Sequence, residues 1–236
     1  MAGPVLAAFL VLLFVSCDQG PGTAPKEEQC RAVAGDVIQP LAKGNYWQKV
    51  KHAVPESTVI DTIRSSIEGV LPVNVNDNTY NAYKRKRNGG FERLFWNGPK
   101  GLYTLGMIAS NDTMRIEPKL KYKYPVSVGE EWHTLNIQWD KFNGVTIRDT
   151  LTYEAVKTGE KFITQLDTFD TVVYHWYAQQ ALPDVSSYWH IFEYYAPGIG
   201  HVGTRLYSHE DTSYSYGDRE EMDLRTETEL IDYCLK

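Results

Sequence analysis

The chain has 236 residues, 42% hydrophobic content and a formal net charge of −6. This length suits one large β domain or two small ones, and the hydrophobic content supports a sizeable core. The acidic balance argues against nucleic acid as a main partner and against a polybasic membrane-binding surface, because both require a basic face. Sixteen Tyr and six Trp favour strands, so the composition predicts a mainly β protein.

The first segment, residues 1–16, is typical of a signal peptide. The apolar run 4–16 has about 13 residues, whereas a membrane-spanning helix needs about 20. The sequence Phe14-Val15-Ser16-Cys17 resembles a bacterial lipobox, which implies that Cys17 becomes the first mature residue and carries a lipid. An ordinary cleaved secretory peptide and a buried apolar N-terminus are the alternatives. The lack of Lys and Arg before this run leaves open a true start upstream of Met1.

Residues 17–29 are polar and rich in Gly and Pro, which predicts a flexible, lipid-anchored tether before a β domain at 30–236. Cys30 and Cys234 lie near the two ends of that domain. In an oxidising compartment they could form a disulfide, and two free buried thiols are the alternative. Neither cysteine has a CxxC partner, so a zinc site is not expected.

Short β segments separated by turn residues fill the rest of the chain. Asn88-Gly89-Gly90 and Ser110-Asn111-Asp112 predict hairpin turns. The segment 59–70 is ambiguous, because the helical spacing of its apolar residues competes with a β-branched content that favours a strand. The apolar residues at helical spacing are Val59, Ile63, Ile67 and Val70. The expected strands are 46–54, 79–87, 91–96, 102–109, 113–120, 133–139, 145–156, 161–166, 171–178, 188–195, 201–207 and 222–233.

A near-repeat stands before two of these strands. PLAKGNYW at 40–47 and PVSVGEEW at 125–132 share the pattern P-x-x-x-G-x-x-W. Pro fixes an extended entry, Gly permits the turn and Trp provides a core anchor. The shared residues are Pro40, Gly44 and Trp47 in the first copy and Pro125, Gly129 and Trp132 in the second. Chance similarity is the alternative to two related sheet units at about 36–120 and 121–236.

Five segments in order, PLAKGNYW, GLYTLG, PVSVGEEW, TFDTVVY and EYYAPGIGHV, resemble a widespread group of uncharacterised bacterial envelope lipoproteins. In the last segment, Pro197, Gly198 and Gly200 read as a tight turn. The resemblance covers residues 40 to about 233. It implies a curved antiparallel sheet or half-barrel with few or no long helices, distantly like periplasmic lipoprotein carriers. It brings no catalytic residues and implies a cell-envelope location, facing the periplasm or the exterior.

Catalytic and metal-binding motifs are absent from the sequence. There is no Gly-x-Ser-x-Gly elbow and no HExxH. His190, His201 and His209 would approach a metal only if their strands were neighbours. The adjacent carboxylates Glu130-Glu131 and Glu220-Glu221 would point to opposite strand faces, so neither pair forms a catalytic dyad. The sequence predicts no cofactor and no metal.

The run Lys84-Arg85-Lys86-Arg87 is the one dense basic stretch. Before a hairpin turn, it predicts a solvated, charged edge that discourages strand-to-strand aggregation. Contact with an anionic lipid or a polysaccharide is the alternative.

The sequence therefore favours a non-catalytic, lipid-anchored envelope protein whose β domain binds or scaffolds a partner. Its partners would be the membrane, through the lipid, and a lipid or envelope protein. A concave sheet could hold an apolar ligand. The candidate lining residues are Trp47, Trp132, Trp176 and Trp189, and packing in the core is the favoured alternative for each. The alternative is an envelope hydrolase that acts on glycans or esters through a carboxylate or histidine site.

Overall fold

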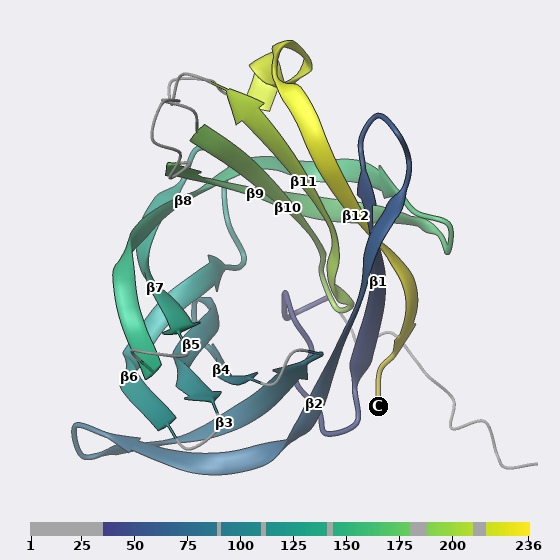
Figure 1. Cartoon of the computed structure of the whole chain (residues 1–236). Coiled ribbons are helices and arrows are strands. Elements are labelled where there is room, and N and C mark those ends of the chain that lie inside the picture. Colours follow the sequence, from purple (N-terminus) through teal and green to yellow (C-terminus); the bar gives the residue numbers. More distant parts are fainter. Residues whose placement is uncertain (1–34, 89–90, 110–111, 141–143, 180–187, 210–215) are drawn as a thin grey trace, which may run out of the picture.

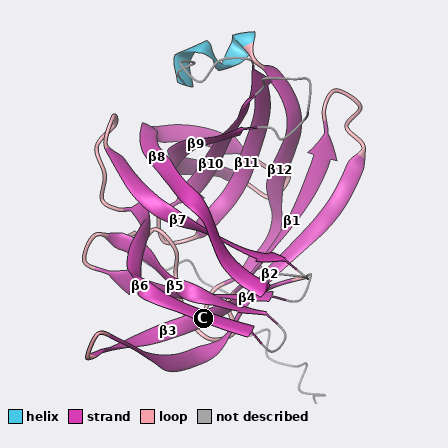
Figure 2. Cartoon of the chain, turned by 60° about the vertical axis from the view of Figure 1, so that its left-hand side comes forward, coloured by secondary structure: helices cyan, strands magenta, loops and turns pink. Residues whose placement is uncertain are grey.

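The computed structural model describes residues 35–88, 91–109, 112–140, 144–179, 188–209 and 216–236. Most of these residues are in strands, and a short 3-10 helix, η1 (Tyr216–Glu221), lies at one end of the molecule (Figure 2). None of the helical segments described could span a membrane. The strands are β1 (Tyr46–Ala53), β2 (Val59–Val75), β3 (Asn78–Arg87), β4 (Phe91–Gly98), β5 (Gly101–Ala109), β6 (Asp112–Lys123), β7 (Glu131–Asp140), β8 (Gly144–Ile163), β9 (Thr168–Gln179), β10 (Tyr188–Ala196), β11 (Gly200–His209) and β12 (Asp223–Cys234).

One antiparallel sheet contains all twelve strands, in the order β6-β5-β4-β3-β2-β1-β12-β11-β10-β9-β8-β7. The sheet curls until its two edges approach each other, so that it almost closes into a barrel (Figure 1). Side chains bridge the seam between the edges. Trp132 Nε1 donates to Lys121 O at 3.2 Å, and Val145 N donates to Asp112 Oδ2 at 2.6 Å. The predicted fold class, a curved antiparallel sheet with few or no long helices, is confirmed.

The ambiguous segment 59–70 is part of strand β2. Ile63 and Ile67 are buried, and the residues between them alternate in exposure. Their spacing of four residues fits a strand as well as a helix, because four is a multiple of the strand period of two. Val70, which completed the helical pattern, is exposed.

Residues 145–156 and 161–166 were expected to be separate strands, but most of this stretch forms the single strand β8. Gly159, between them, has φ of 71° at a shift in the β8–β9 register. The glycine therefore serves a β-bulge inside a continuous strand instead of a turn between two strands.

The near-repeat forms the same turn twice. Gly44 N donates to Ile67 O at 2.9 Å, and Gly129 N donates to Ala155 O at 2.8 Å. Both glycines have positive φ, 92° and 84°, which favours glycine. Each turn leads into the first strand of a six-stranded meander, β1–β6 or β7–β12.

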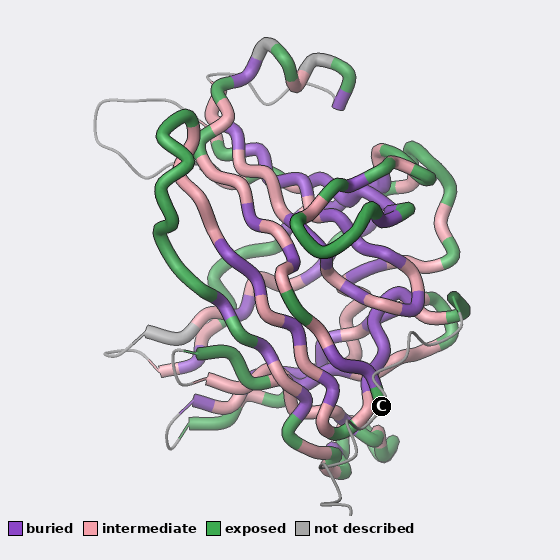
Figure 3. The backbone as a smooth tube through the Cα atoms, turned by 90° about the vertical axis from the view of Figure 1, so that its right-hand side faces the viewer, coloured by how far each residue is buried: buried purple, intermediate pink, exposed green. Residues whose placement is uncertain are grey.

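Burial alternates along the strands, as expected for a curled sheet with one face inside (Figure 3). Many of the largest fully buried side chains are aromatic, among them Tyr153, Tyr174 and Phe192. One end of the barrel is closed by the segment before β1. There Ile38 is buried, Asn97 Nδ2 donates to Gln39 O at 3.0 Å, and the chain continues into β1.

Candidate functional site

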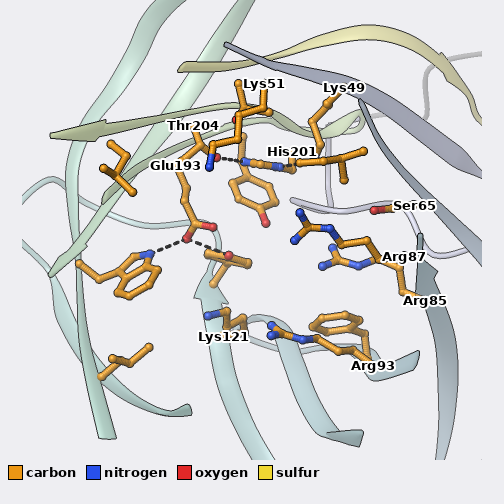
Figure 4. Close-up of a pocket in the computed structure, with 18 of the residues that line it drawn as sticks. Lys49, Lys51, Ser65, Arg85, Arg87, Arg93, Lys121, Glu193, His201 and Thr204 are labelled. Atoms are coloured by element: carbon orange, nitrogen blue, oxygen red, sulfur yellow. Dashed lines mark hydrogen bonds between the residues drawn. The ribbon is translucent and has the colours of Figure 1, made fainter. Parts of the chain in front are cut away.

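The barrel encloses a cavity of about 330 Å³, lined by residues from both meanders. Among the residues that the structure describes, six lysines and arginines line it, whereas Glu193 is the one carboxylate. Figure 4 shows three arginines directed into the cavity from one wall and Glu193 reaching in from the opposite wall. The six cationic residues are Lys49, Lys51, Arg85, Arg87, Arg93 and Lys121.

Strand periodicity explains how these cations come to face inward. Lys49 and Lys51 lie two residues apart on β1, and Arg85 and Arg87 lie two residues apart on β3, so each pair shares a face. The intervening Lys86 is exposed, and Lys84 Nζ lies 3.1 Å from Glu92 Oε2. The predicted role of this basic run as a solvated sheet edge is wrong, because β3 lies between β2 and β4.

Arg85 and Arg93 lie directly opposite each other on the paired strands β3 and β4. Like charges at directly opposed positions destabilise a sheet. Both arginines make cation–π contacts. The guanidinium of Arg85 lies 4.6 Å from the Phe95 ring centroid, and that of Arg93 lies 5.9 Å from the Phe91 ring centroid. Burial lowers the pKa of Arg93, and the neighbouring charge of Arg85 lowers it further.

Lys49, on β1, is buried in the cavity lining and only 7% exposed. Its Nζ contacts His201 Nδ1. Burial, followed by the charges of Arg85 and Arg87, lowers the pKa of Lys49 to about 7. Burial together with the Lys49 charge holds the pKa of His201 well below its usual range.

On the far side of the arginines, Lys121 Nζ contacts Tyr153 Oη. Burial lowers the pKa of Lys121 to about 8, and the opposing charge of Glu193 limits that decrease. Both lysines would therefore titrate within or close to the physiological pH range.

Glu193 is held in place on β10. Its Oε2 accepts hydrogen bonds from Tyr122 Oη at 2.9 Å and Trp176 Nε1 at 3.0 Å. No described residue donates to Oε1, which leaves that oxygen available to the cavity. Across the β10–β11 ladder, Glu193 is paired with Thr204, which also lines the cavity.

Exposure increases along the basic wall in one direction. On β1 it increases from the buried Lys49 to the half-buried Lys51, and on β3 it increases from the half-buried Arg85 to the exposed Arg87. The cavity is therefore closed near the start of β1 and accessible near its end, where a small solute could enter.

None of the six cations forms an ion pair with a carboxylate within the described part of the chain. Five of the six are buried or half-buried, and such charges are unfavourable without a counter-ion, so proteins seldom keep them for stability. A strongly perturbed cluster in a cavity is instead typical of a functional site. The arrangement can bind anions, because it offers several donors and excess positive charge.

The four candidate tryptophans have different environments. Trp176 lines the cavity, while Trp47 and Trp132 are buried in the core. Trp47 Nε1 donates to Ile199 O at 2.6 Å in the turn of Pro197, Gly198 and Gly200, which joins β10 to β11. Trp189 is 39% exposed. The cationic lining differs from the apolar lining that an acyl-chain carrier would require.

The three histidines do not form one group, although His209, opposite Tyr188 on the β10–β11 ladder, is a diagonal neighbour of His190. His201 lines the cavity, whereas His190 lies against His175, with 3.1 Å between His175 Nε2 and His190 Nδ1. The residues that the structure describes contain no group of three His, Cys, Asp or Glu side chains suited to a metal. Cys17 and Cys30 lie outside the described residues, and Cys234 is disulfide-bonded.

Sequence reasoning missed the basic interior. The available signal was the K-R-K-R run, since alternation on a strand places its two arginines on one face. Lys49, Arg93 and Lys121 are isolated in the sequence, and only the closure of the sheet places them beside those arginines.

No protein-family model matches this sequence, and no curated protein is similar enough to be counted as a relative. Two crystal structures are similar to this chain. A candidate lipoprotein from Parabacteroides distasonis has 13% identity and a TM-score of 0.45, covering 87% of this chain and 100% of its own. A candidate exported protein with a YmcC-like fold, from Bacteroides fragilis, has 12% identity and a TM-score of 0.48, covering 85% of this chain and 100% of its own.

Proposed function

We propose that this chain is a non-catalytic, lipid-anchored cell-envelope protein that holds a small anionic ligand inside its barrel. The observation that carries the proposal is the cavity with six cations, none of them ion-paired in the described chain, and one carboxylate. A bound anion would neutralise charges that otherwise oppose the folded state. The lipobox-like segment ending at Cys17 supports the envelope location.

The lining gives no support to a glycosidase. That chemistry needs two carboxyl groups facing each other across the bond to be cleaved. Glu193 is the one carboxylate among the lining residues that the structure describes, and its Oε2 is engaged by Tyr122 and Trp176. Binding is therefore the function that the site supports best.

Thermal unfolding of the full chain in sulfate and in chloride, at equal ionic strength, tests the proposal. A dianion that binds the folded state stabilises it by about 2.7 kcal/mol at 100 times Kd, which corresponds to roughly 5–10 °C in Tm for a chain of this size. We expect sulfate, but not chloride, to raise the Tm of the wild type and of Lys86→Gln by this amount. The rise in the Tm of Arg85→Gln should be much smaller.

Lys86→Gln is the matched control, because Lys86 is exposed next to Arg85 on the same strand. Without sulfate, Arg85→Gln should unfold at the same or a higher temperature than the wild type, because it removes the repulsion from Arg93. Equal sulfate effects in all three proteins would overturn the proposal.

A further inference from the structure

We propose that the anion is a phosphate ester of a small hydroxylated molecule, with its phosphoryl group at Arg85, Arg87 and Arg93 and a hydroxyl at Glu193. This inference rests on the proposed function, because it assigns the chemical class of the ligand in the same cavity. Three features support it: the guanidinium cluster, the charges on the two faces of one hairpin, and the acceptor on the opposite wall.

Three guanidinium groups gather on two adjacent strands. Arg85 faces Arg93 across the β3–β4 ladder, and Arg87 follows Arg85 on the same face of β3. Each guanidinium offers N–H donors in a planar fork that suits the oxygens of phosphate and carboxylate. A phosphoryl group has three terminal oxygens and a charge near −2, so it matches three such groups better than a single carboxylate does.

The outward face of the same hairpin provides an internal comparison. There, Lys84 is paired with Glu92, with 3.1 Å between the nitrogen and the oxygen. On the inward face the hairpin places arginine opposite arginine instead. Toward solvent the two strands thus supply a carboxylate beside Lys84 and Lys86, whereas toward the cavity they supply none, and a ligand can provide the missing negative charge.

The opposite wall provides a second, different contact. Glu193 is fixed through Oε2 by Tyr122 and Trp176, while Oε1 accepts no hydrogen bond from a described residue. An acceptor in this position binds a hydroxyl or an ammonium group. A hydroxyl is favoured, because an ammonium group would lie among six cations. Thr204, paired with Glu193 across the ladder, also lines the cavity, and its Oγ1 lies 2.9 Å from His201 Nε2.

The cavity volume limits the size of the ligand. About 330 Å³ is near the lower end of the range for small-molecule sites. A short phosphorylated polyol would match this space and both walls. The headgroup of a phosphoglycerol lipid presents the same phosphoglycerol group as a phosphodiester, with two free oxygens and one negative charge, so it would engage fewer of the guanidinium N–H donors. These two sources share one chemistry, so the experiment must separate them.

Calorimetric titration of the full chain with glycerol 1-phosphate, ethyl phosphate and succinate tests the assignment. We expect glycerol 1-phosphate to bind about tenfold more tightly than ethyl phosphate, which lacks the hydroxyls. Arg93→Gln should weaken both phosphate esters about tenfold or more, and Lys86→Gln should leave them unchanged. Glu193→Gln should abolish the preference for glycerol 1-phosphate over ethyl phosphate. The loss of the negative charge can lower the Kd of both esters without restoring that preference.

A parallel measurement separates the two sources of the phosphoglycerol group. If the ligand is a lipid headgroup, vesicles of phosphatidylglycerol bind the full chain more tightly than vesicles of phosphatidylcholine, and Arg93→Gln reduces this difference. If the ligand is a free ester, Arg93→Gln weakens glycerol 1-phosphate and leaves vesicle binding unchanged.

The contrary outcomes distinguish this inference from the proposed function. If succinate binds as tightly as the phosphate esters and depends on Arg93 in the same way, the phosphate assignment is wrong and anion binding stands. If no anion binds, and Arg93→Gln behaves like Lys86→Gln, both proposals fail. The Tm of each variant, measured alongside, shows that the chain is folded.

Discussion

The environment of Lys49 makes the stability of the folded protein depend on pH. It is 7% exposed, its Nζ contacts His201, and the charged groups that face it are Arg85 and Arg87 on β3 and Glu193 on β10. Burial lowers its pKa to about 7, compared with 10.5 for an unperturbed lysine. Between these two values the unfolded chain binds a proton that the folded chain does not, so stability rises with pH.

Replacement of Lys49 by methionine should therefore stabilise the protein in the absence of a ligand. We expect an increase of about 1–4 kcal/mol in the free energy of unfolding at pH 6, the range seen when buried charges are replaced by apolar groups. The increase should shrink between pH 7 and pH 10, where the folded wild-type lysine is already neutral.

Urea denaturation of the wild type and Lys49→Met at pH 6, 7.5 and 9 measures this difference. Lys86→Met, at an exposed position of β3, is the control and should show little pH-dependent change. An increase of the same size at pH 6 and pH 9 would contradict a lowered lysine pKa in the folded protein.

At the scale of elements, turns and strands differ in how well the sequence predicts them. The pattern P-x-x-x-G-x-x-W correctly marks the entries to β1 and β7, because proline, a positive-φ glycine and a large anchor act locally. Bulges are harder to recognise. Gly159 resembles a turn residue in the sequence, and only pairing with β9 shows that β8 continues through it.

Gly129 tests the role of the second turn. A Cβ built on it meets no atom within 4 Å, but its φ is +84°, so Gly129→Ala changes backbone strain without a clash. We expect a loss of about 1–2 kcal/mol in the free energy of unfolding. Denaturant titration measures it.

Gly69→Ala provides the matched control. Gly69 lies in β2, also with no atom within 4 Å of a built Cβ, but without a left-handed φ. Alanine there should be neutral or stabilise by about 0.5–1 kcal/mol. Equal effects at the two positions would show that the turn does not require glycine.

At the scale of the whole molecule, the average composition conceals the interior. A net charge of −6 correctly suggests that the chain is not a generally basic protein, yet six cations gather inside its barrel. They come from four strands, and their proximity depends on how far the sheet curls. No local pattern encodes that closure, so the fold class could be predicted while the site could not.

Disulfide bonding and lipidation also concern the molecule as a whole. Cys234 ends β12 and is disulfide-bonded, and we predict Cys30 as its partner. Peptide mapping without reduction, on protein extracted from its native membrane, should join these two cysteines. Reduction should lower the free energy of unfolding by about 2–5 kcal/mol.

The same mapping tests the anchor. The first mature peptide should begin at Cys17 and carry the mass of a diacylglycerol. An unmodified N-terminus, upstream or downstream of Cys17, would contradict lipidation. A Cys17–Cys234 bridge would contradict both the anchor and the predicted cysteine pair.

The two meanders also bear on how such a site could arise. All six cavity cations belong to β1–β6, whereas Glu193 and Thr204 belong to β7–β12. Two identical subunits related by a two-fold axis would have to place the same charges on both walls. Joined in one chain, the two meanders can carry different residues, one supplying the cations and the other the acceptors. The covalent link between the meanders thus permits a chemically polar cavity that a symmetric dimer of one meander could not form.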